Sequence, residues 1–348
     1  MFKKISVKEV RQETSDAVSV AFEISEALKN EFQYQAGQYI TIKHIINGED
    51  VRRAYSLSSA PNENDYRIAV KKIENGKMST FLNESLKNGD TLEIMPPSGS
   101  FKVLNNSANN VGFAAGSGIT PIISMIKSVL NAGGSFTLFY SNKTANDVIF
   151  KEEIEDLKSK YPSNLKVYYI YSRENNGNEL LEGRINKDKC DGLMKNELEL
   201  LKADGFYMCG PEEMVANISD SLAGFGISKD KIHYELFAAP TDKMKEEVVV
   251  SDFTGESQIH VIMDGEDFEF SLKNDGDFIL DAAMAAGADA PFSCKGAVCC
   301  TCKAQVIEGK ATMDMNYSLS EEEVDEGFIL TCQARPASAK LVVDYDVI

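Results

Sequence analysis

Cys294-Lys295-Gly296-Ala297-Val298-Cys299-Cys300-Thr301-Cys302 is the most informative segment of the chain, and it specifies the architecture of the C-terminal part. Three of its cysteines, Cys294, Cys299 and Cys302, follow the spacing C-x4-C-x2-C, and Cys332 comes farther along. Five of the seven cysteines lie after position 290, and this clustering indicates chemistry rather than scattered core positions. A tight loop can deliver three thiolates to a metal centre and a distant strand the fourth, so we expect a metal centre here.

The spacing is typical of the ligands of a [2Fe–2S] cluster. Gly296 would let the backbone approach the cluster, and loop amides could donate hydrogen bonds to its sulfides. Zinc is the alternative, but zinc sites usually combine C-x2-C with a second C-x2-C or a histidine pair. No second C-x2-C exists, and His260 is the only histidine nearby. We therefore predict that Cys294, Cys299, Cys302 and Cys332 bind the irons and that Cys300, one position too far from Cys294, does not.

The sequence around this loop predicts a multi-domain protein with four segments. Residues 1–104 carry short strand patterns with glycine turns, which indicate an antiparallel β-barrel. Residues 105–237 alternate strand and helix, which indicates an α/β domain with a parallel sheet. Residues 238–256 are mostly polar and are predicted to be a linker, and residues 257–348 open with a hairpin pattern around Asp264-Gly265 and contain the cysteine loop.

Composition excludes several classes of protein. Lys and Arg number 36 against 54 Asp and Glu, giving a formal charge of −18, which argues against binding to nucleic acid or to anionic lipid. Glycines, Pro121 and Lys127 interrupt the most apolar stretch, 111–130, so no membrane span is expected. The first residues lack the apolar core of a signal peptide. We expect a cytoplasmic protein, whose cysteines would stay reduced.

Two short motifs in the first segment suit a flavin. In Arg53-Ala54-Tyr55-Ser56, the arginine could hold a phosphate, the ring of Tyr55 could lie on the flavin face, and the hydroxyl of Ser56 could bond near flavin N5. Gly76-Lys77-Met78-Ser79-Thr80 is predicted to start a helix at Ser79, whose free amides could hold a pyrophosphate. The alternative is a strand with a solvated arginine and a core tyrosine.

The second segment carries a glycine loop, Gly116-Ser117-Gly118-Ile119-Thr120-Pro121, between a buried strand and a helix. This is a phosphate-binding position, although Pro121 replaces the third glycine of G-x-G-x-x-G. The acid that usually grips the ribose of NAD is absent from Phe139-Tyr140-Ser141-Asn142. Ser172-Arg173, after the next strand, could hold a 2′-phosphate and so favours NADPH, or could be a solvated loop.

Cys209-Gly210-Pro211 ends another predicted strand, 205–208. Functional sites in parallel sheets lie at the carboxyl ends of strands, which makes Cys209 and Gly210 candidates. The alternative is a buried structural cysteine, which is common for this residue type. Cys190 lacks such a context and is predicted to be structural.

The ordered set R-x-Y-S, G-x-G-x-x-P, C-G-P and the C-terminal C-x4-C-x2-C…C resembles the ferredoxin–NADP reductase superfamily with a fused plant-type ferredoxin. The resemblance implies an FAD-binding barrel, an NADP-binding domain and a β-grasp ferredoxin domain. FMN stays open, because related reductases use either flavin. Carried over to this sequence, it implies flavin contacts for Arg53, Tyr55 and Ser56 and pyrophosphate contact for Ser79. It also implies the following nucleotide- and flavin-facing residues: Gly116 to Pro121, Cys209, Glu235 and Phe237.

The tail, from Pro291 to Pro336, resembles the reductase subunits of phenylacetyl-CoA epoxidases, which act in phenylacetate breakdown. The resemblance implies that electrons pass from NADPH to FAD, to the [2Fe–2S] cluster and then to a diiron oxygenase. Ser56, Cys209 and Glu235 would lie at the reacting centre. Two alternatives remain: a reductase for a Rieske dioxygenase, a hydroxylase or a hybrid-cluster protein, and a non-enzymatic redox sensor built from the same domains.

Overall fold

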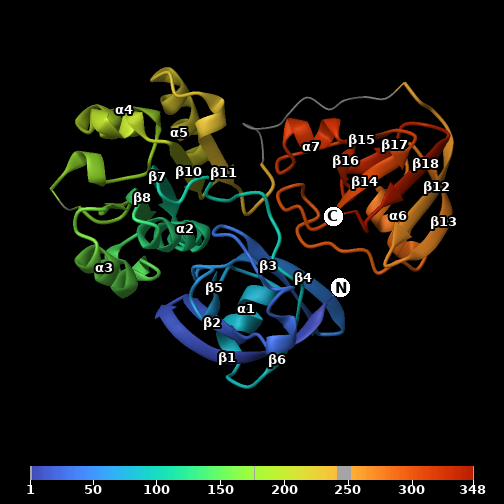
Figure 1. Ribbon diagram of the computed structural model, residues 1–348, viewed down its shortest axis with the longest axis horizontal. Coiled ribbons are helices and arrows are strands. Elements are labelled where there is room, and N and C mark those ends of the chain that lie inside the picture. Colours follow the sequence, from blue (N-terminus) through green and yellow to red (C-terminus); the bar gives the residue numbers. More distant parts are fainter. Residues whose placement is uncertain (1, 176, 241–251, 348) are drawn as a thin grey trace. The chain divides into compact units, whose positions relative to one another are not determined.

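A computed structural model describes residues 2–175, 177–240 and 252–347 of the chain. The chain divides into two compact units, Met1–Phe237 and Ala238–Ile348 (Figure 1). The first unit holds two hydrophobic cores and the second unit holds one. Most of the linker predicted over 238–256, namely 241–251, lies outside the described residues.

The first core belongs to an antiparallel six-stranded sheet of order β4-β3-β6-β1-β2-β5. A bridge between Leu57 and Ile68 joins the two edge strands, so the sheet closes into a barrel, as the sequence predicts. Helix α1 packs Met78 and Leu82 into this core. The elements are β1 (Lys3–Thr14), β2 (Ala17–Glu23), β3 (Tyr39–Ile46), β4 (Glu49–Ser56), β5 (Tyr66–Lys71), α1 (Lys77–Glu84) and β6 (Thr91–Ile94).

The second core belongs to a five-stranded sheet of order β11-β10-β7-β8-β9, in which every pairing is parallel. Helices α2 and α3 lie on one face and α4 and α5 on the other (Figure 1). The strands are β7 (Asn109–Ala115), β8 (Ser135–Asn142), β9 (Leu165–Tyr171), β10 (Gly205–Cys209) and β11 (Ile232–Glu235). The helices are α2 (Ile119–Asn131), α3 (Lys151–Lys160), α4 (Lys187–Asn196) and α5 (Glu212–Gly224).

The strand order reverses between β7 and β10. Strands β8 and β9 extend the sheet on one side of β7, and strands β10 and β11 extend it on the other side. Such a switch point opens a crevice at the carboxyl ends of the strands, where ligands of this fold class bind. The chain brings the glycine loop to this point after β7 and the Cys209-Gly210 pair after β10. The topology therefore puts two predicted motifs on neighbouring strands.

One helix start differs from the sequence-based expectation: helix α1 begins at Lys77 rather than Ser79, with Gly76 as its N-cap. Helix α3 begins at Lys151, because Thr144 and Asp147 form a capping box around a separate short turn and Phe150 has a φ of +60°. Helix α2 begins at Ile119, so Pro121 lies inside the first turn, where its missing N–H costs no hydrogen bond.

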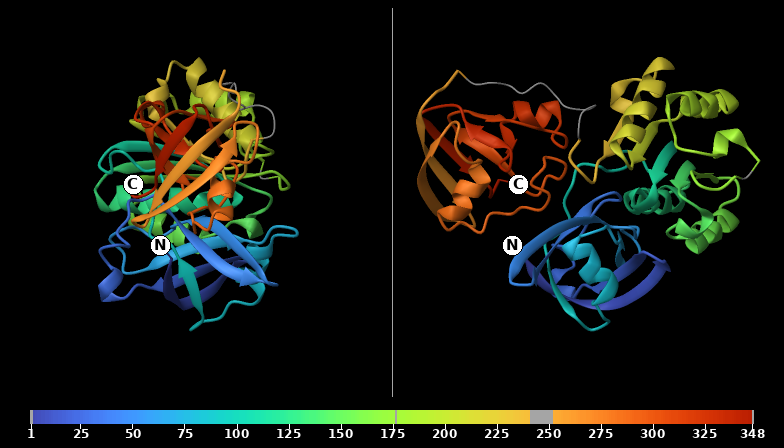
Figure 2. Two further views of the ribbon diagram at one scale, coloured as in Figure 1. Left: turned by 90° about the vertical axis from the view of Figure 1, so that its right-hand side faces the viewer. Right: turned by 180° about the vertical axis from the view of Figure 1, so that it is seen from behind.

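The second unit is a mixed five-stranded sheet of order β13-β12-β18-β14-β16 with a small second sheet of β15 and β17 (Figure 2). Strands β12 and β13 form the predicted hairpin, turning at Asp264 and Gly265, whose φ angles are 54° and 75°. The strands are β12 (Glu256–Met263), β13 (Glu266–Lys273), β14 (Lys303–Glu308), β15 (Ala311–Met313), β16 (Phe328–Leu330), β17 (Ala334–Pro336) and β18 (Lys340–Asp344). The helices are α6 (Ile279–Ala285) and α7 (Glu321–Asp325).

We predict that residues 252–348, expressed alone, fold into a stable domain. The residues of the buried core of this unit, from Ile259 to Tyr345, all belong to the unit itself, as in a domain that folds independently. Starting at 252 keeps the hydrogen bonds between Asn274 and the backbone of Phe253 and Gly255. Thermal unfolding followed by circular dichroism should be cooperative, and iron and sulfide should give a red-brown protein. A fragment that stays insoluble or never takes up a cluster would contradict this prediction.

Candidate functional site

The glycine loop and the Cys209 motif touch at the switch point of the parallel sheet. A Cβ atom added to Gly118 would lie 2.0 Å from the carbonyl oxygen of Cys209 and 3.1 Å from the nitrogen of Gly210. A Cβ atom on Gly210 would lie 2.5 Å from the end of Met214. Only backbone without side chains fits at this approach, so the two strand ends come as close as the chain permits.

Two side-chain hydrogen bonds fix the conformation of the glycine loop. The hydroxyl of Tyr140, on β8, donates to the carbonyl of Gly116 at 3.0 Å, and the hydroxyl of Thr120 donates to the carbonyl of Ser117 at 3.0 Å. Gly116 has a φ of +53° and nothing within 4 Å of the place where a Cβ would stand. Thr120 and Pro121 are buried, so they shape the loop and the exposed backbone is left to meet a phosphate.

Three predicted residues from separate elements converge beside this loop. Ser56, at the end of β4, donates a hydrogen bond from its hydroxyl to the Oε2 of Glu235 at 3.1 Å. Glu235 ends β11 and stands in register with Cys209, which ends β10. The barrel and the parallel sheet therefore meet at Ser56, Cys209 and Glu235, the three residues predicted for the reacting centre.

Burial sets the protonation of this cluster. Desolvation raises the pKa of Glu235 to about 8, against the opposing effect of the hydrogen bond from Ser56. Desolvation and the charge of Glu235 raise the pKa of the Cys209 thiol well above its usual value. Near neutral pH both groups are therefore protonated, so this corner of the site is uncharged and offers hydrogen-bond donors.

The remaining residues predicted to contact the flavin lie in the barrel domain. Arg53 is exposed on β4, and Tyr55 is half-buried. The hydroxyl of Ser79 accepts from the N–H of Ile73 at 3.3 Å and donates to the carbonyl of Gly76 at 3.3 Å, closing the turn before α1. The side chain of Met78 lies in the barrel core, so only its backbone N–H can meet a ligand. The donors fit a phosphate-bearing flavin: an exposed guanidinium and the open first turn of a helix.

Ser172 and Arg173 follow β9, two strands away from the glycine loop. The N–H of Ser172 donates to the carbonyl of Asn142 at 2.9 Å, and the N–H of Arg173 donates to that of Lys143 at 2.8 Å. Lys143 and Arg173 are both exposed, so two cations stand at the ends of neighbouring strands. The carboxylate of Glu174 accepts from the N–H of Ala145 at 3.0 Å at the same edge. Arg173 is thus a surface cation at the carboxyl end of β9, and its contact with a 2′-phosphate stays a prediction.

Phe237 lies two residues beyond the end of β11, and its side chain is 48% exposed. An exposed aromatic ring just after Glu235 is consistent with the expected flavin contact, which stays a prediction. Cys190 is fully buried on α4, with a raised pKa caused mainly by desolvation, as expected for a structural cysteine.

The four predicted iron ligands fall into two pairs. The Cys299 thiol donates to the Sγ of Cys294 at 3.1 Å, and Cys302 and Cys332 share a hydrogen bond of their own. Cys299 together with the amides of Gly296, Val298 and Cys299 itself lowers the pKa of Cys294 to about 6. A hydrogen bond from Cys302 lowers the pKa of Cys332. One thiol of each pair is therefore disposed to ionise, which metal binding requires.

The paired arrangement suits two metal ions better than one. A structural zinc site needs four ligands around one ion, whereas a [2Fe–2S] cluster takes two thiolates on each iron. The donor set therefore fits a binuclear cluster.

The backbone of the cysteine loop is curled around these thiols. Lys295 and Ala297 have φ angles of 49° and 60°, so two residues adopt left-handed conformations around Gly296. This turns the N–H of Gly296 toward the Sγ of Cys294, 3.3 Å away. Successive amides turned to one side make an anion-binding concavity, which suits the negative charge of a thiolate cluster.

Cys300 points elsewhere. Its thiol donates to the carbonyl of Ser318 at 3.4 Å, and its side chain belongs to the hydrophobic core of the unit. That Cys300 is not a ligand stays a prediction, which this contact with Ser318 supports.

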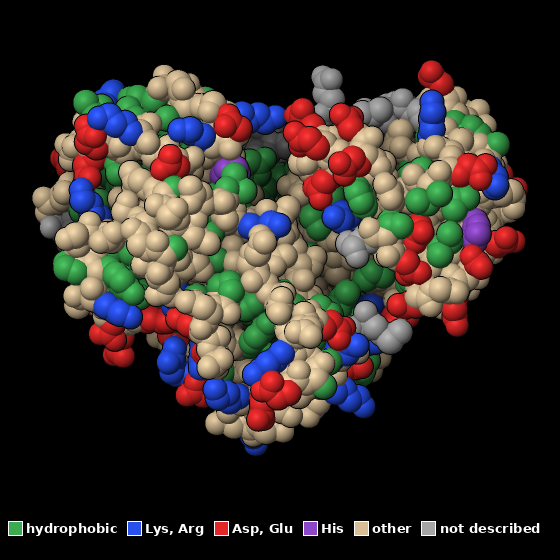
Figure 3. Space-filling model, in the orientation of Figure 1, with side chains coloured by type: hydrophobic (Ala, Val, Ile, Leu, Met, Phe, Trp, Pro, Cys, Tyr) green, Lys and Arg blue, Asp and Glu red, His purple; other side chains and the backbone are tan. Residues whose placement is uncertain are grey.

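Negative charge gathers on the same unit. Helix α7 consists of Glu321, Glu322, Glu323, Val324 and Asp325, and acidic side chains cover the surface around it (Figure 3). In the described parts of the chain, no helix has both the length and the apolarity that a bilayer crossing demands.

Sequence reasoning missed two residues that shape the site. Tyr140 supports the glycine loop, although a tyrosine in a buried strand carries no signal of that role. Lys127 is buried on α2 with several polar partners, and the sequence shows it only as a charge inside an apolar helix. In both cases the partner lies far away in the sequence.

Three family models match this chain in the order of its domains. An oxidoreductase FAD-binding domain covers residues 4–103, and an oxidoreductase NAD-binding domain covers 113–220. A 2Fe-2S iron-sulfur cluster binding domain covers residues 261–337. The cofactors of the protein are accordingly FAD, a nicotinamide nucleotide and a [2Fe–2S] cluster.

Similar proteins share this whole arrangement. A subunit of the 1,2-phenylacetyl-CoA epoxidase from Escherichia coli is 37% identical over 99% of this chain and 98% of its own length. The ferredoxin reductase component of 3-ketosteroid-9-alpha-monooxygenase from Rhodococcus rhodochrous is 32% identical over 98% of this chain and 96% of its own. The crystal structure of phthalate dioxygenase reductase superimposes with a TM-score of 0.60 at 22% identity, covering 99% of this chain and 98% of that one.

The fold and site therefore define an electron-transfer oxidoreductase with flavin, nicotinamide nucleotide and iron–sulfur domains on one chain. The chain belongs to the ferredoxin–NADP reductase superfamily, in the branch whose members are reductase components of multicomponent oxygenases and carry a fused [2Fe–2S] domain.

We predict that Cys300→Ser keeps a [2Fe–2S] cluster with about two irons and two sulfides per chain, because Cys300 faces Ser318 rather than the paired thiols. The matched control is Cys299→Ser, which should lose the cluster. Iron and sulfide analysis and the visible spectrum measure both. Loss of the cluster in Cys300→Ser, with Cys299→Ser unaffected, would exchange the two assignments.

We also predict a pH-dependent stability difference between Glu235→Gln and the unmodified protein. The folded pKa of Glu235, about 8, exceeds its unfolded value, so the folded state retains a proton that the unfolded state loses as the pH rises. The unmodified protein should therefore lose stability from about pH 5 to about pH 8 relative to the glutamine variant, which cannot ionise. Urea midpoints of the flavin-free proteins across this range measure the difference, and an offset that does not change with pH would contradict the prediction.

Proposed function

We propose that this protein takes a hydride from NADPH and delivers electrons one at a time to the diiron oxygenase of a phenylacetyl-CoA epoxidase. The observation that carries the proposal is the convergence of Ser56, Cys209 and Glu235 beside the glycine loop, on a chain that also carries four paired cluster cysteines. The bound flavin supplies the conversion from two-electron to one-electron transfer, and the cluster supplies the exit to a partner.

The chain's own residues position the reactants. The backbone of Gly116 to Gly118 and the first turn of α2 hold the nucleotide phosphates, and Arg53 with the first turn of α1 holds those of the flavin. Tyr55 and Phe237 would flank the ring of a bound flavin. Gly118 packs against the carbonyl of Cys209, and a bound nicotinamide would lie near the carboxyl end of β10.

Ser56 and Glu235 control protons at the reacting end. The hydroxyl of Ser56 lies 3.1 Å from Glu235, whose raised pKa keeps the carboxyl protonated near neutral pH. A neutral carboxyl and a hydroxyl can donate hydrogen bonds without adding a negative charge next to a group that is about to receive a hydride. The thiol of Cys209 is also neutral, so all three side chains at this end of the site are uncharged.

The partner is inferred from the relatives. The Escherichia coli protein, which is part of a phenylacetyl-CoA epoxidase, matches along nearly its full length. Other relatives are reductase components of a ketosteroid monooxygenase and a glycine betaine monooxygenase, so a different multicomponent oxygenase, such as a Rieske dioxygenase or a hydroxylase, is the second candidate. The acidic surface around α7 favours a partner with a basic docking face and disfavours nucleic acid. The seven cysteines, all among the described residues, form no disulfide, which suits the reducing cytoplasm.

Reconstitution tests the proposal. The purified protein with NADPH should support product formation by the oxygenase subunits of a phenylacetyl-CoA epoxidase, and much less by those of a ketosteroid or glycine betaine monooxygenase. The matched control is Cys302→Ser, which should still reduce ferricyanide through the flavin and fail to drive the oxygenase. Faster turnover with a Rieske-type oxygenase would identify that oxygenase as the partner instead. Equal turnover with and without the cluster would overturn the proposed electron path.

We predict a preference for NADPH that depends on Arg173. The guanidinium can pair with a 2′-phosphate, and a charge-assisted contact contributes roughly 1.5–3 kcal/mol, or about 10- to 150-fold at ~1.4 kcal/mol per decade. Arg173→Ala should raise KM for NADPH by about that factor and leave NADH nearly unchanged. Arg184→Ala, at an exposed arginine of the same domain, is the control. Equal kcat/KM for the two nucleotides in the unmodified protein would contradict the predicted preference for NADPH.

A further inference from the structure

Helix α2 carries a buried lysine where the parallel-sheet domain meets the barrel. Lys127 is 6% exposed, and its Nζ donates to the carbonyl of Ser58 at 3.1 Å. The same ammonium pairs with the carboxylates of Glu63 at 3.4 Å and Glu153 at 2.5 Å. Ser58 and Glu63 belong to the segment after β4, whereas Glu153 lies on α3. One cation therefore ties together the barrel, α2 and α3.

A second contact lies one turn earlier on α2. The hydroxyl of Ser124, which is fully buried, donates to the carbonyl of Ser59 at 2.6 Å. From the barrel side, the hydroxyl of Tyr34 donates to the same carbonyl at 3.0 Å. Ser124 and Lys127 thus bind two consecutive carbonyls of the barrel from one face of the helix.

These carbonyls face α2 because the barrel strand leaves its regular ladder at this point. The N–H of Ser58 still pairs with the carbonyl of Arg67 at 2.7 Å, but the N–H of Arg67 pairs with the hydroxyl of Ser59 instead of a backbone carbonyl. Ser58 and Ser59 are each 1% exposed, so their carbonyls need a donor within the protein. Helix α2 supplies it.

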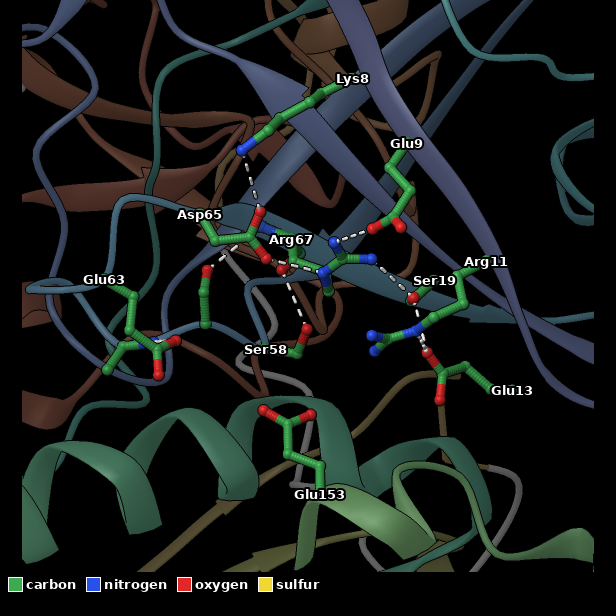
Figure 4. A network of polar contacts seen from close by, with 12 residues as sticks. Lys8, Glu9, Arg11, Glu13, Ser19, Ser58, Glu63, Asp65, Arg67 and Glu153 are labelled. Carbon is green, nitrogen blue, oxygen red and sulfur yellow. Dashed lines mark hydrogen bonds and ion pairs between the residues drawn. The ribbon is translucent and has the colours of Figure 1, made fainter. Parts of the chain in front are cut away.

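Arg67, on β5, holds the same segment from the barrel side (Figure 4). Its Nε donates to Asp65 at 2.7 Å, its Nη1 donates to Ser19 at 2.9 Å, and its Nη2 pairs with Glu9. The segment after β4 is thereby fixed to the barrel strands on one side and to α2 on the other. It has little freedom to move relative to either.

The position of these contacts in the chain gives them a functional consequence. Ser58 lies two residues after Ser56, at the end of the flavin strand, and α2 begins directly after the glycine loop. The contacts therefore join the two elements that must hold the flavin and the nicotinamide in register. Reaction rates respond steeply to such registration, and a misplacement of about 1 Å can cost about 100-fold.

We propose that Lys127, assisted by Ser124, is a positioning residue that sets the distance between the nicotinamide and the flavin, and so the rate of hydride transfer. The inference rests on the flavin and nucleotide sites of the proposed function and adds a residue outside both. Lys127 touches neither motif, so its loss changes the approach of the two bound rings while the contacts that bind each of them stay intact.

Anaerobic stopped-flow reduction of the flavin-loaded protein by NADPH tests the proposal. Lys127→Met keeps the length of the side chain and removes its donors. At saturating NADPH the rate of flavin reduction should fall by about 10- to 100-fold, while the dissociation constant for NADPH stays nearly unchanged. The long-wavelength absorbance band of the nucleotide–flavin complex should weaken, and reduction by dithionite should not change.

Three further variants separate positioning from folding. Ser124→Ala removes the second contact with a smaller change and should also slow reduction, so it decides the matter if Lys127→Met does not fold. Lys127→Arg, which keeps the charge and the donors, should recover most of the rate. Lys202→Met, at an exposed lysine paired with the nearby Glu199, is the matched control and should behave like the unmodified protein.

The proposal is overturned if flavin-loaded Lys127→Met and Ser124→Ala are reduced at the unmodified rate, even where their thermal stability is lower. It is equally overturned if the only change is weaker binding of NADPH. Reduction of the unmodified protein by NADPH tests the proposed function separately, because the positioning role is read from the ratio of variant to unmodified rates.

Discussion

The close approach of Gly118 to the carbonyl of Cys209 holds the redox site together. It joins the strand ends on either side of the switch point, so the phosphate-binding loop and the residue at the nicotinamide position cannot move independently. Because Cys209 stands in register with Glu235, the same contact also carries the carboxyl that meets Ser56 of the barrel. A side chain at position 118 would separate all of these groups at once.

The reacting centre is built from groups that burial keeps neutral. A carboxyl with a pKa of about 8 and a thiol with a strongly raised pKa stand together, and their mutual repulsion when charged reinforces the effect of desolvation. Neutral groups at this position suit a reductase, because a hydride transfer moves negative charge toward the acceptor. The structure thus uses two ionisable residues mainly as neutral donors, at the expense of stability at higher pH.

In the cysteine loop, by contrast, two of the cysteine pKa values are lowered. Hydrogen bonds from their thiol partners and from backbone amides lower the pKa values of Cys294 and Cys332, whereas the pKa values of the partners Cys299 and Cys302 are raised, so one thiol of each pair favours the thiolate. Two left-handed residues, Lys295 and Ala297, turn the amides inward at a cost in backbone strain. The strain is held by the core packed around the loop, to which Ala297 and Cys300 both belong.

The antiparallel and parallel sheets could be predicted from the sequence, because they are written in local spacing and periodicity. The cofactor classes followed from the resemblance of the ordered motifs to a known superfamily. The assignment of the four cluster cysteines rests on their spacing and stays a prediction. The meeting of Ser56 with Glu235 beside Cys209, the burial of the Met78 side chain and the contact of Cys300 with Ser318 became visible only in the folded chain. The same holds for the roles of Tyr140 and Lys127, whose partners include backbone carbonyls. The physical reason is that every residue offers the same carbonyl group, so a sequence cannot show which carbonyls the fold leaves unpaired and presents to a distant side chain.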